Sequence, residues 1–301
     1  MKTVFTPLFF LLLGMQVHAQ TMTDGLLLPK KVLCTGLAYG HDSWNEYWEG
    51  GLKRTNGNIG TVTTQSVGLE GAYGLDDKVN ILYGLPYVWT QASAGTLAGQ
   101  SDFQDLTLAL KYLALDQAIG TSAIRLHALL AGSFPITDYT PDFLPMSIGM
   151  GSKNLSLRGI FSLDLKHGFY TDLSAAYIWR SNVEIDRTSY FYDGKLINSN
   201  QVDIANRSDF HLAVGYRNDK LQANIFYNPS FTLGGDDIRR QDMPFVANNL
   251  DMQRVGALCR YHFTRNFTGW EINASASYVV AGRNVGQSTA FMLGLFYAFA
   301  I

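Results

Sequence analysis

Charged residues are scarce in this sequence. Only 16% of its 301 residues are Asp, Glu, Lys or Arg, whereas a soluble domain carries about 25%. The 23 basic and 25 acidic residues nearly cancel to a net charge of −2, which argues against the basic footprint of a nucleic-acid-binding protein. Aromatic residues make up 13% and there are 29 glycines, so the chain has enough apolar surface to fold and is not disordered.

Long apolar runs and cysteine clusters are also lacking. Beyond the N-terminus, no run approaches the roughly 18 consecutive apolar residues of a transmembrane helix. A membrane barrel is still allowed, because its strands carry only a weak alternating signal. Cys34 and Cys259 are the only cysteines, and we expect two free, buried thiols on distant strands, one inward and one outward. The sequence has no Cys/His cluster with metal spacing, and we expect no metal and no cofactor.

The N-terminus has the pattern of a secretory signal peptide. Lys2 precedes an apolar core over 4–14, and Val17-His18-Ala19 supplies the small residues of a cleavage site. We expect residues 1–19 to be removed. Residues 20–31 then form a short N-terminal segment, and 32–301 form the folded domain.

The recurring pattern is an alternation of apolar with polar or small residues. Leu155–Leu165 and Trp270–Val280 show it clearly, and a period of two predicts half-exposed strands instead of helices. About twelve such segments follow one another, each near the length of a tilted membrane strand. They cover residues 32–40, 61–73, 78–91, 104–115, 122–136, 154–165, 169–192, 195–217, 220–234, 250–264, 268–283 and 287–301.

Short and long connections alternate between these segments. The short ones lie at 74–77, 116–121, 166–168, 218–219 and 265–267, the long ones at 41–60, 92–103, 137–153 and 235–249, with a hairpin tip at Asp193-Gly194 and a short link at 284–286. Outer-membrane barrels have short periplasmic turns and longer outer loops. We therefore predict an all-β fold, a transmembrane antiparallel up-and-down β-barrel of about 12 strands. A soluble two-sheet sandwich is the alternative, but it would show more outward charge.

Aromatic residues gather at the ends of the predicted strands, where a membrane barrel has interfacial girdles. The chain ends in Ile301, with Phe299 two residues earlier, near the signal that the barrel assembly machinery recognises. We expect a monomer in the outer membrane of a Gram-negative bacterium, with lipid and a small-molecule solute as its other partners. The girdle candidates are Tyr87, Trp89, Tyr177, Trp179, Tyr190, Tyr192, Tyr227, Tyr261, Phe263, Trp270 and Tyr278.

Several short motifs resemble a known family. Tyr73-Gly74-Leu75 and Asp77 are followed by Leu85-Pro86-Tyr87, then by Asp105-Leu106 and Lys111-Tyr112. Together with Asp24–Lys30, these motifs resemble the outer-membrane family named for the MetA pathway of phenol degradation, although Phe103-Gln104 replaces the usual Gly-rich lead. The clear motifs cover residues 24–115. The resemblance implies a monomeric barrel that passes small molecules, including hydrophobic or aromatic compounds.

Strand phase places ionisable side chains of both signs on the inward face. Two interpretations stay open: the charges pair across strands and fill the barrel, or they form a constriction that selects solutes by charge. The lumen candidates are Glu70, Lys111, Arg125, Arg158, Asp164, Arg180, Arg217, Arg254, Arg260, His262 and Glu271. Arg158 and Asp164 share one face of one strand, so a network between them is plausible.

The loop at 41–60 is the richest in side chains. Its Trp44, Tyr47 and Trp48 either line the outer mouth for flat solutes or anchor in the outer interface. His41 and Ser43 point to the same side if that stretch is a strand, as a Ser–His pair would require.

The sequence therefore predicts a channel or transport protein for small molecules, not an enzyme. Two alternatives remain open. One is a barrel lipid hydrolase that uses Ser43 and His41. The other is a closed structural barrel whose outer loops bind a partner.

Overall fold

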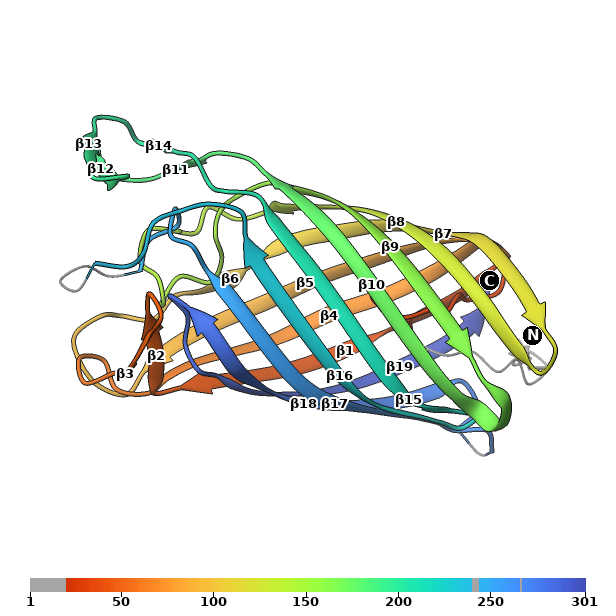
Figure 1. The fold of residues 1–301 in the computed structure, drawn as a ribbon. Coiled ribbons are helices and arrows are strands. Elements are labelled where there is room, and N and C mark those ends of the chain that lie inside the picture. Colours follow the sequence, from red (N-terminus) through yellow and green to blue (C-terminus); the bar gives the residue numbers. More distant parts are fainter. Residues whose placement is uncertain (1–19, 240–243, 266) are drawn as a thin grey trace, which may run out of the picture.

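The computed structural model describes residues 20–239, 244–265 and 267–301. Within them, twelve long antiparallel strands close into one barrel (Figure 1). Each long strand pairs with the next one in the chain, and β1 pairs with β19 to close the circle. The predicted up-and-down barrel is confirmed. Its strands are β1 (Val32–Trp44), β4 (Val62–Asp76), β5 (Val79–Ala92), β7 (Asp105–Ile119), β8 (Ser122–Pro135), β9 (Asn154–Asp164), β10 (Phe169–Arg180), β15 (Arg207–Arg217), β16 (Leu221–Thr232), β17 (Asp251–His262), β18 (Trp270–Arg283) and β19 (Thr289–Ala300).

Alternation along each strand separates an apolar outer face from a polar inner face. In β9, Leu155 and Leu157 point outward and are 50% and 51% exposed, whereas Arg158 and Ser162 point inward and are buried. This is the reverse of a soluble protein, whose exposed side chains are mostly polar. An apolar band around a polar interior is the arrangement of a barrel surrounded by lipid.

Aromatic rings gather at both ends of the outer face. Tyr177 and Trp179 lie 4.8 Å apart between ring centroids near one end, and Trp270 and Tyr297 lie 5.0 Å apart near the other. Such rings sit well at the boundary between lipid and water, because they have an apolar body and a polar tip.

The two ends of the barrel differ in their connections. At one end, which we call the turn end, short links join the strands, β1 begins and β19 ends (Figure 1). Gly120 in the β7–β8 turn has a φ of 63°, a conformation that costs glycine little. At the other end, which we call the loop end, the connections are longer.

The longest connection corrects two predicted strands. We expected strands over 169–192 and 195–217, but β10 ends at Arg180 and β15 begins at Arg207. Between them lie four short strands: β11 (Val183–Glu184), β12 (Tyr190–Tyr192), β13 (Lys195–Ile197) and β14 (Gln201–Val202). The predicted tip at Asp193-Gly194 is confirmed, and both residues have positive φ.

The ladder stops at Arg180 because the apolar residues that follow pack into a small core of their own. Val183, Val202 and Ile204 are buried there against Val246, which comes from the connection after β16. Tyr190 and Tyr192 belong to the same core. The prediction that these two tyrosines lie in the aromatic girdle is therefore wrong.

Two smaller differences concern the first connection and the barrel rim. The predicted loop at 41–60 begins as strand, since β1 continues to Trp44, and then forms the hairpin of β2 (Glu46–Glu49) and β3 (Leu52–Thr55). A short β6 (Ser101–Phe103) pairs with β5. Helical structure in the described ranges amounts to a 3-10 turn over Lys166–Gly168, so none of it has the length and apolar character that a membrane-spanning helix needs.

The outer band gives a direct test of which face meets lipid. Ile225 lies outward near the middle of β16 and is 70% exposed, and arginine at the bilayer midplane costs about 2–4 kcal/mol. We expect Ile225→Arg to lower the free energy of unfolding from lipid vesicles by that amount. The matched control is Leu196→Arg, at a residue that is 64% exposed but lies in β13 of the loop end. Equal effects of the two substitutions would contradict the assignment of the band.

Candidate functional site

The N-terminal segment, residues 20–31, lies inside the barrel and forms the short lumenal tuck that its length allows. Leu28 is 1% exposed and packs with inward residues of the wall such as Val32 and Leu82. With the Asn80 amide oriented so that its oxygen faces Leu28, this oxygen accepts a hydrogen bond from the Leu28 backbone N–H. The amide nitrogen of Asn80 then donates to the Leu28 carbonyl. At Gly25, an added Cβ would lie 2.3 Å from the Cβ of Ser162, so only glycine fits this close approach.

Asp24 ties this segment to the wall. Its Oδ1 lies 3.0 Å from Lys111 Nζ, and its Oδ2 lies 3.2 Å from an Arg260 terminal nitrogen. Lys111 Nζ also donates to the Asp24 carbonyl at 2.7 Å and to the Thr21 carbonyl at 3.1 Å. Lys111 is 0% exposed and Arg260 is 2% exposed. We call Asp24, Lys111 and Arg260 the plug cluster.

The ionised state of Asp24 follows from these neighbours. Burial alone would raise the pKa of the Asp24 carboxyl, but Lys111, Arg260 and the Thr21 hydroxyl together hold it well below its usual range. The carboxylate is therefore charged at any physiological pH and neutralises part of the buried positive charge.

A second group of charges lies at the turn end. Asp164 pairs with both Arg125 and Arg217, and Arg217 Nε donates to Asp164 Oδ1 at 2.9 Å. Arg217 also approaches Asp172 at 3.5 Å and stacks over the ring of Tyr170, 3.9 Å from its centroid. Two arginines and two aspartates balance here, as in a packing network. We call these four charged residues the Asp164 cluster.

A third group lies toward the loop end. Arg158 donates to Ser174 Oγ at 2.9 Å and to Asp209 Oδ2 at 2.8 Å. Arg207 reaches the other oxygen of Asp209, at 3.5 Å. The Asp209 carboxylate therefore binds the guanidinium groups of both Arg158 and Arg207.

Two further arginines adjoin this group. Arg254 lies 3.8 Å from Asp42 Oδ2, the longest ion pair in the described part of the chain, and shares the inner wall of β15–β17 with Arg207. Arg180 lies on the inward face of β10, two residues beyond Ile178, which is opposite Arg207 in the register of β10 and β15. We call the following six residues the loop-end arginine cluster: Arg158, Arg180, Arg207 and Arg254, with Asp42 and Asp209.

A connection at the loop end folds into the barrel mouth. Within residues 136–153, Met146 is 0% exposed and its carbonyl accepts a hydrogen bond from Thr90 Oγ1 at 2.6 Å. The Tyr139 hydroxyl lies 2.6 Å from Asp105 Oδ1. Since Thr90 and Asp105 point inward from the wall, this connection narrows the lumen from the side opposite to the N-terminal segment.

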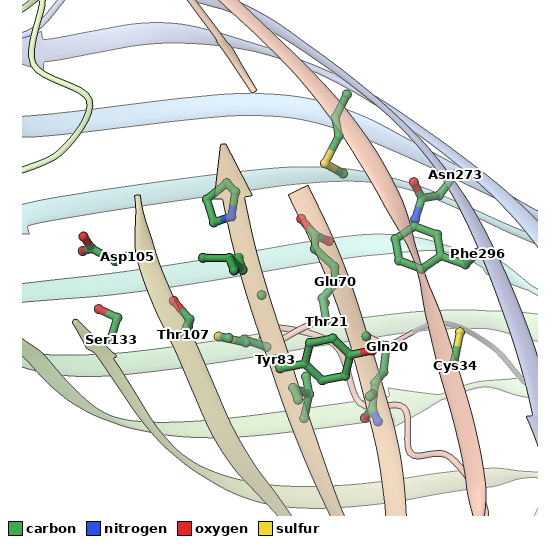
Figure 2. Close-up of a pocket in the computed structure, with 18 of the residues that line it drawn as sticks. Gln20, Thr21, Cys34, Glu70, Tyr83, Asp105, Thr107, Ser133, Asn273 and Phe296 are labelled. Carbon is green, nitrogen blue, oxygen red and sulfur yellow. The ribbon is translucent and has the colours of Figure 1, made fainter. Parts of the chain in front are cut away.

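A cavity of about 410 Å³ lies in the lumen between these two obstructions. Gln20 and Thr21 of the N-terminal segment line it on one side, and Asp105 lines it toward the loop end (Figure 2). Gln104, the neighbour of Asp105 in the chain, also lines it. We call it the chamber. Its walls add the inward side chains of Cys34, Glu70, Ala72, Leu82, Thr107, Ser133, Asn273, Met292 and Phe296.

The lumen candidates chosen from sequence all lie on the inward face in the structure. Arg158 and Asp164 do not pair with each other, although they share one face of β9: each binds a residue of another strand instead. The others distribute over the three clusters, the chamber wall at Glu70, and a pair in which His262 Nε2 lies 2.7 Å from Glu271 Oε2.

Sequence reasoning missed Asp24, Asp42, Arg207 and Asp209 as members of these clusters. A signal existed for Asp24, since it begins the Asp24–Lys30 motif of the family resemblance. Arg207 and Asp209 alternate in phase with Arg217, so the same strand pattern already placed them inward.

The three aromatic candidates of the outer mouth pack among the loops. Trp44 lies against the cluster of Ile59, Val62 and Met146 inside the mouth, and its ring centroid is 6.2 Å from that of Tyr47. Trp48 is 9% exposed.

His41 and Ser43 point to the outer side of β1, since they share a face with exposed Leu37 and Tyr39. Within the part of the chain that the structure describes, no hydrogen bond joins their side chains.

Both cysteines are free, as expected. Cys34 is buried and points inward to the chamber. Cys259 points outward and is exposed, so the expectation that both thiols are buried is wrong for Cys259. Its outward position on β17 puts it among the small side chains of the lipid-facing surface.

A closed barrel with an apolar outer band, aromatic girdles and a charged interior defines the class of bacterial outer-membrane β-barrels. Within that class, the chain belongs to the family described as "Putative MetA-pathway of phenol degradation", whose profile matches residues 56–295. The resemblance seen in the sequence is thus confirmed.

Solved structures agree on the fold. The chain is similar to an outer membrane channel from Pseudomonas putida, with 15% identity and a TM-score of 0.72, over 91% of this chain and 97% of that one. Two weaker likenesses are a NanC porin, at 10% identity, TM-score 0.47 and coverage of 87% and 98%, and the translocator domain of the autotransporter NalP from Neisseria meningitidis, at 10%, 0.44, 90% and 89%. Both scores are too low to carry an argument. No curated protein matches the chain.

The role of Asp24 can be tested through Cys34, which lines the chamber beside the N-terminal segment. Removing one partner of a buried charge pair costs about 3–5 kcal/mol, so Asp24→Asn should loosen the segment. In a Cys259→Ser background, we expect a small water-soluble thiol reagent to modify Cys34 at least tenfold faster. The control is Asp76→Asn, which breaks the exposed pair of Asp76 with Lys30. Equal rates in all three proteins would show that Asp24 does not hold the segment.

Proposed function

We propose that this protein is an outer-membrane channel that passes small molecules from the loop end, outside the cell, to the turn end in the periplasm. The observation that carries the proposal is the chamber, a space of about 410 Å³ inside a closed barrel with polar groups on its walls. Short turns face the periplasm in barrels of this class. Membership of the family and the fold shared with an outer membrane channel from Pseudomonas putida support the same role.

The chamber favours a compact solute with an apolar body and a polar group. Leu82, Met292 and Phe296 supply apolar surface, while Thr107 and Ser133 supply hydroxyl groups. About 150 Å³ is enough to hold benzene in a protein interior, so the chamber has room for a substituted ring. We include phenols and similar aromatic compounds in the proposed solute class, in keeping with the family description.

Passage through the turn end requires the N-terminal segment to shift. Leu28 and Asp24 fill the lumen between the chamber and the turn end, and both are buried. The segment joins β1 at Lys31 and is not itself part of the ladder between β1 and β19, so it can shift while these strands stay paired. A channel of this kind conducts only when the plug cluster opens.

The closed structural barrel is the competing interpretation, and one observation favours it. The plug cluster and the Asp164 cluster both pair their charges across the lumen, as side chains do when they fill a small barrel. Conductance distinguishes the two interpretations, because a barrel that is permanently filled would not pass ions.

The decisive experiment is single-channel recording of the refolded protein in a planar bilayer, with and without phenol. We expect intermittent openings with a conductance that phenol reduces, since the solute would occupy the chamber. Thr107→Trp should lower both the conductance and the effect of phenol, because the indole would fill part of the chamber. The control, Thr171→Trp, makes the same change on the outer face of β10. A silent bilayer with a folded barrel would overturn the proposal.

A further inference from the structure

The loop-end arginine cluster has more positive than negative groups. It holds four guanidinium groups but only two carboxylates: Arg158 and Arg207 pair with Asp209, and Arg254 pairs with Asp42. Asp209 already binds two of them, and the contact of Asp42 with Arg254 is long, at 3.8 Å. For the side chain of Arg180, the described residues provide no hydrogen bond and no acidic partner.

The same place holds buried donors that lack an acceptor. The Nε atoms of Arg207 and Arg254 and the Oγ of Ser230 are buried, and none has a hydrogen-bond partner among the described residues. Ser230 is 1% exposed. Buried donors are normally paired, so such a group indicates a missing acceptor.

Strand register brings these donors onto one stretch of the inner wall. Asp209 on β15 pairs with Ser230 on β16, and Ser230 pairs with Met252 on β17. Arg207 is two residues from this row toward the loop end, Arg254 is two residues from it toward the turn end, and both share its inward face. The side chains of Arg207 and Arg254 remain 30% and 27% exposed, so a solute in the lumen can reach them.

The other two clusters have no such surplus of positive charge, although Arg125 Nε and Arg217 Nη1 of the Asp164 cluster are also buried without a hydrogen-bond partner among the described residues. In the Asp164 cluster, Arg125 and Arg217 face two aspartates. In the plug cluster, Lys111 and Arg260 share Asp24, and Glu271 adds a second carboxylate within Coulombic range of Arg260. Among the three clusters, only the loop-end arginine cluster therefore has more basic than acidic side chains.

We propose that the loop-end arginine cluster is a binding site for a small oxyanion, a carboxylate or a phosphate group. Guanidinium groups suit such ligands because their N–H donors match two oxygens at once. A bound oxyanion would accept from the free Nε atoms and the Ser230 hydroxyl, and it would balance the surplus charge. The site itself stands on these contacts, and its role in selecting solutes rests on the proposed channel function.

The test measures binding and ion preference separately. Binding of inorganic phosphate and of benzoate to the refolded barrel is followed by titration calorimetry, and the reversal potential is recorded in a KCl gradient. We expect the Arg180→Gln/Arg254→Gln double variant to bind at least tenfold more weakly and to lose anion preference. These two arginines make the fewest contacts in the cluster, so their removal should spare the fold.

Two further variants sharpen the result. Asp42→Asn removes a competing carboxylate from Arg254 and should strengthen binding severalfold. The control Arg283→Gln/Lys53→Gln deletes two positive charges from exposed pairs with Asp237 and Glu46 outside the lumen, and it should leave binding unchanged. Heat-modifiable migration on a gel verifies that each variant is folded.

The outcomes are distinct. Preference for benzoate identifies a carboxylate site, and preference for phosphate identifies a phosphate site. If the natural protein binds neither anion, or if the double variant binds as well as the control, the oxyanion site is wrong even when the channel conducts. Binding without any conductance would support the site and overturn the channel function instead.

Discussion

The lumen of this barrel depends on one carboxylate. Lys111 and Arg260 project from opposite parts of the wall into a space with almost no solvent contact, and two cations buried together are costly without a counter-charge. Asp24 supplies a charge shared by both cations, from a segment that is not part of the wall, and Glu271 of the wall adds a second charge near Arg260. The wall therefore needs the N-terminal segment for its electrostatic balance, and the segment needs the wall for its position.

This constraint divides the interior into regions with different roles. Near the turn end, Asp24 and Asp164 are surrounded by arginine and lysine partners, and the charges hold side chains in place. Toward the loop end, Arg180 and Arg254 have weaker partners or none among the described residues, so donors remain available to a solute. Packing and selection by charge were competing interpretations of the sequence. In the structure, the charges near the turn end fit the packing interpretation, and those toward the loop end fit selection by charge.

Much of the fold followed from short-range pattern. The alternation of Leu155, Leu157 and Phe161 with Arg158 and Ser162 fixes the phase of a strand, because successive side chains in a strand point to opposite faces. Phase alone placed every lumen candidate inward. The same pattern misled over 181–206, where Val183 and Val202 alternate with polar residues but pack against Val246 in a core of loops.

The sequence does not predict which charged side chains pair with one another. Asp24 is 87 residues from Lys111 and 236 residues from Arg260, and only closure of the barrel brings the three together. Strand phase states which face a residue occupies, not its height or its partner across the lumen. For that reason Arg158 and Asp164, two candidates on one strand, belong to different clusters.

The most direct measurement is the single-channel conductance of Asp24→Asn beside the natural protein, in the same bilayer and with folding verified for both. Asparagine keeps the size of the side chain but cannot neutralise Lys111 and Arg260. If the segment held by Asp24 closes the turn end, the variant will show a larger or more frequently open conductance. An unchanged conductance in a folded variant would contradict the view that this carboxylate controls the lumen.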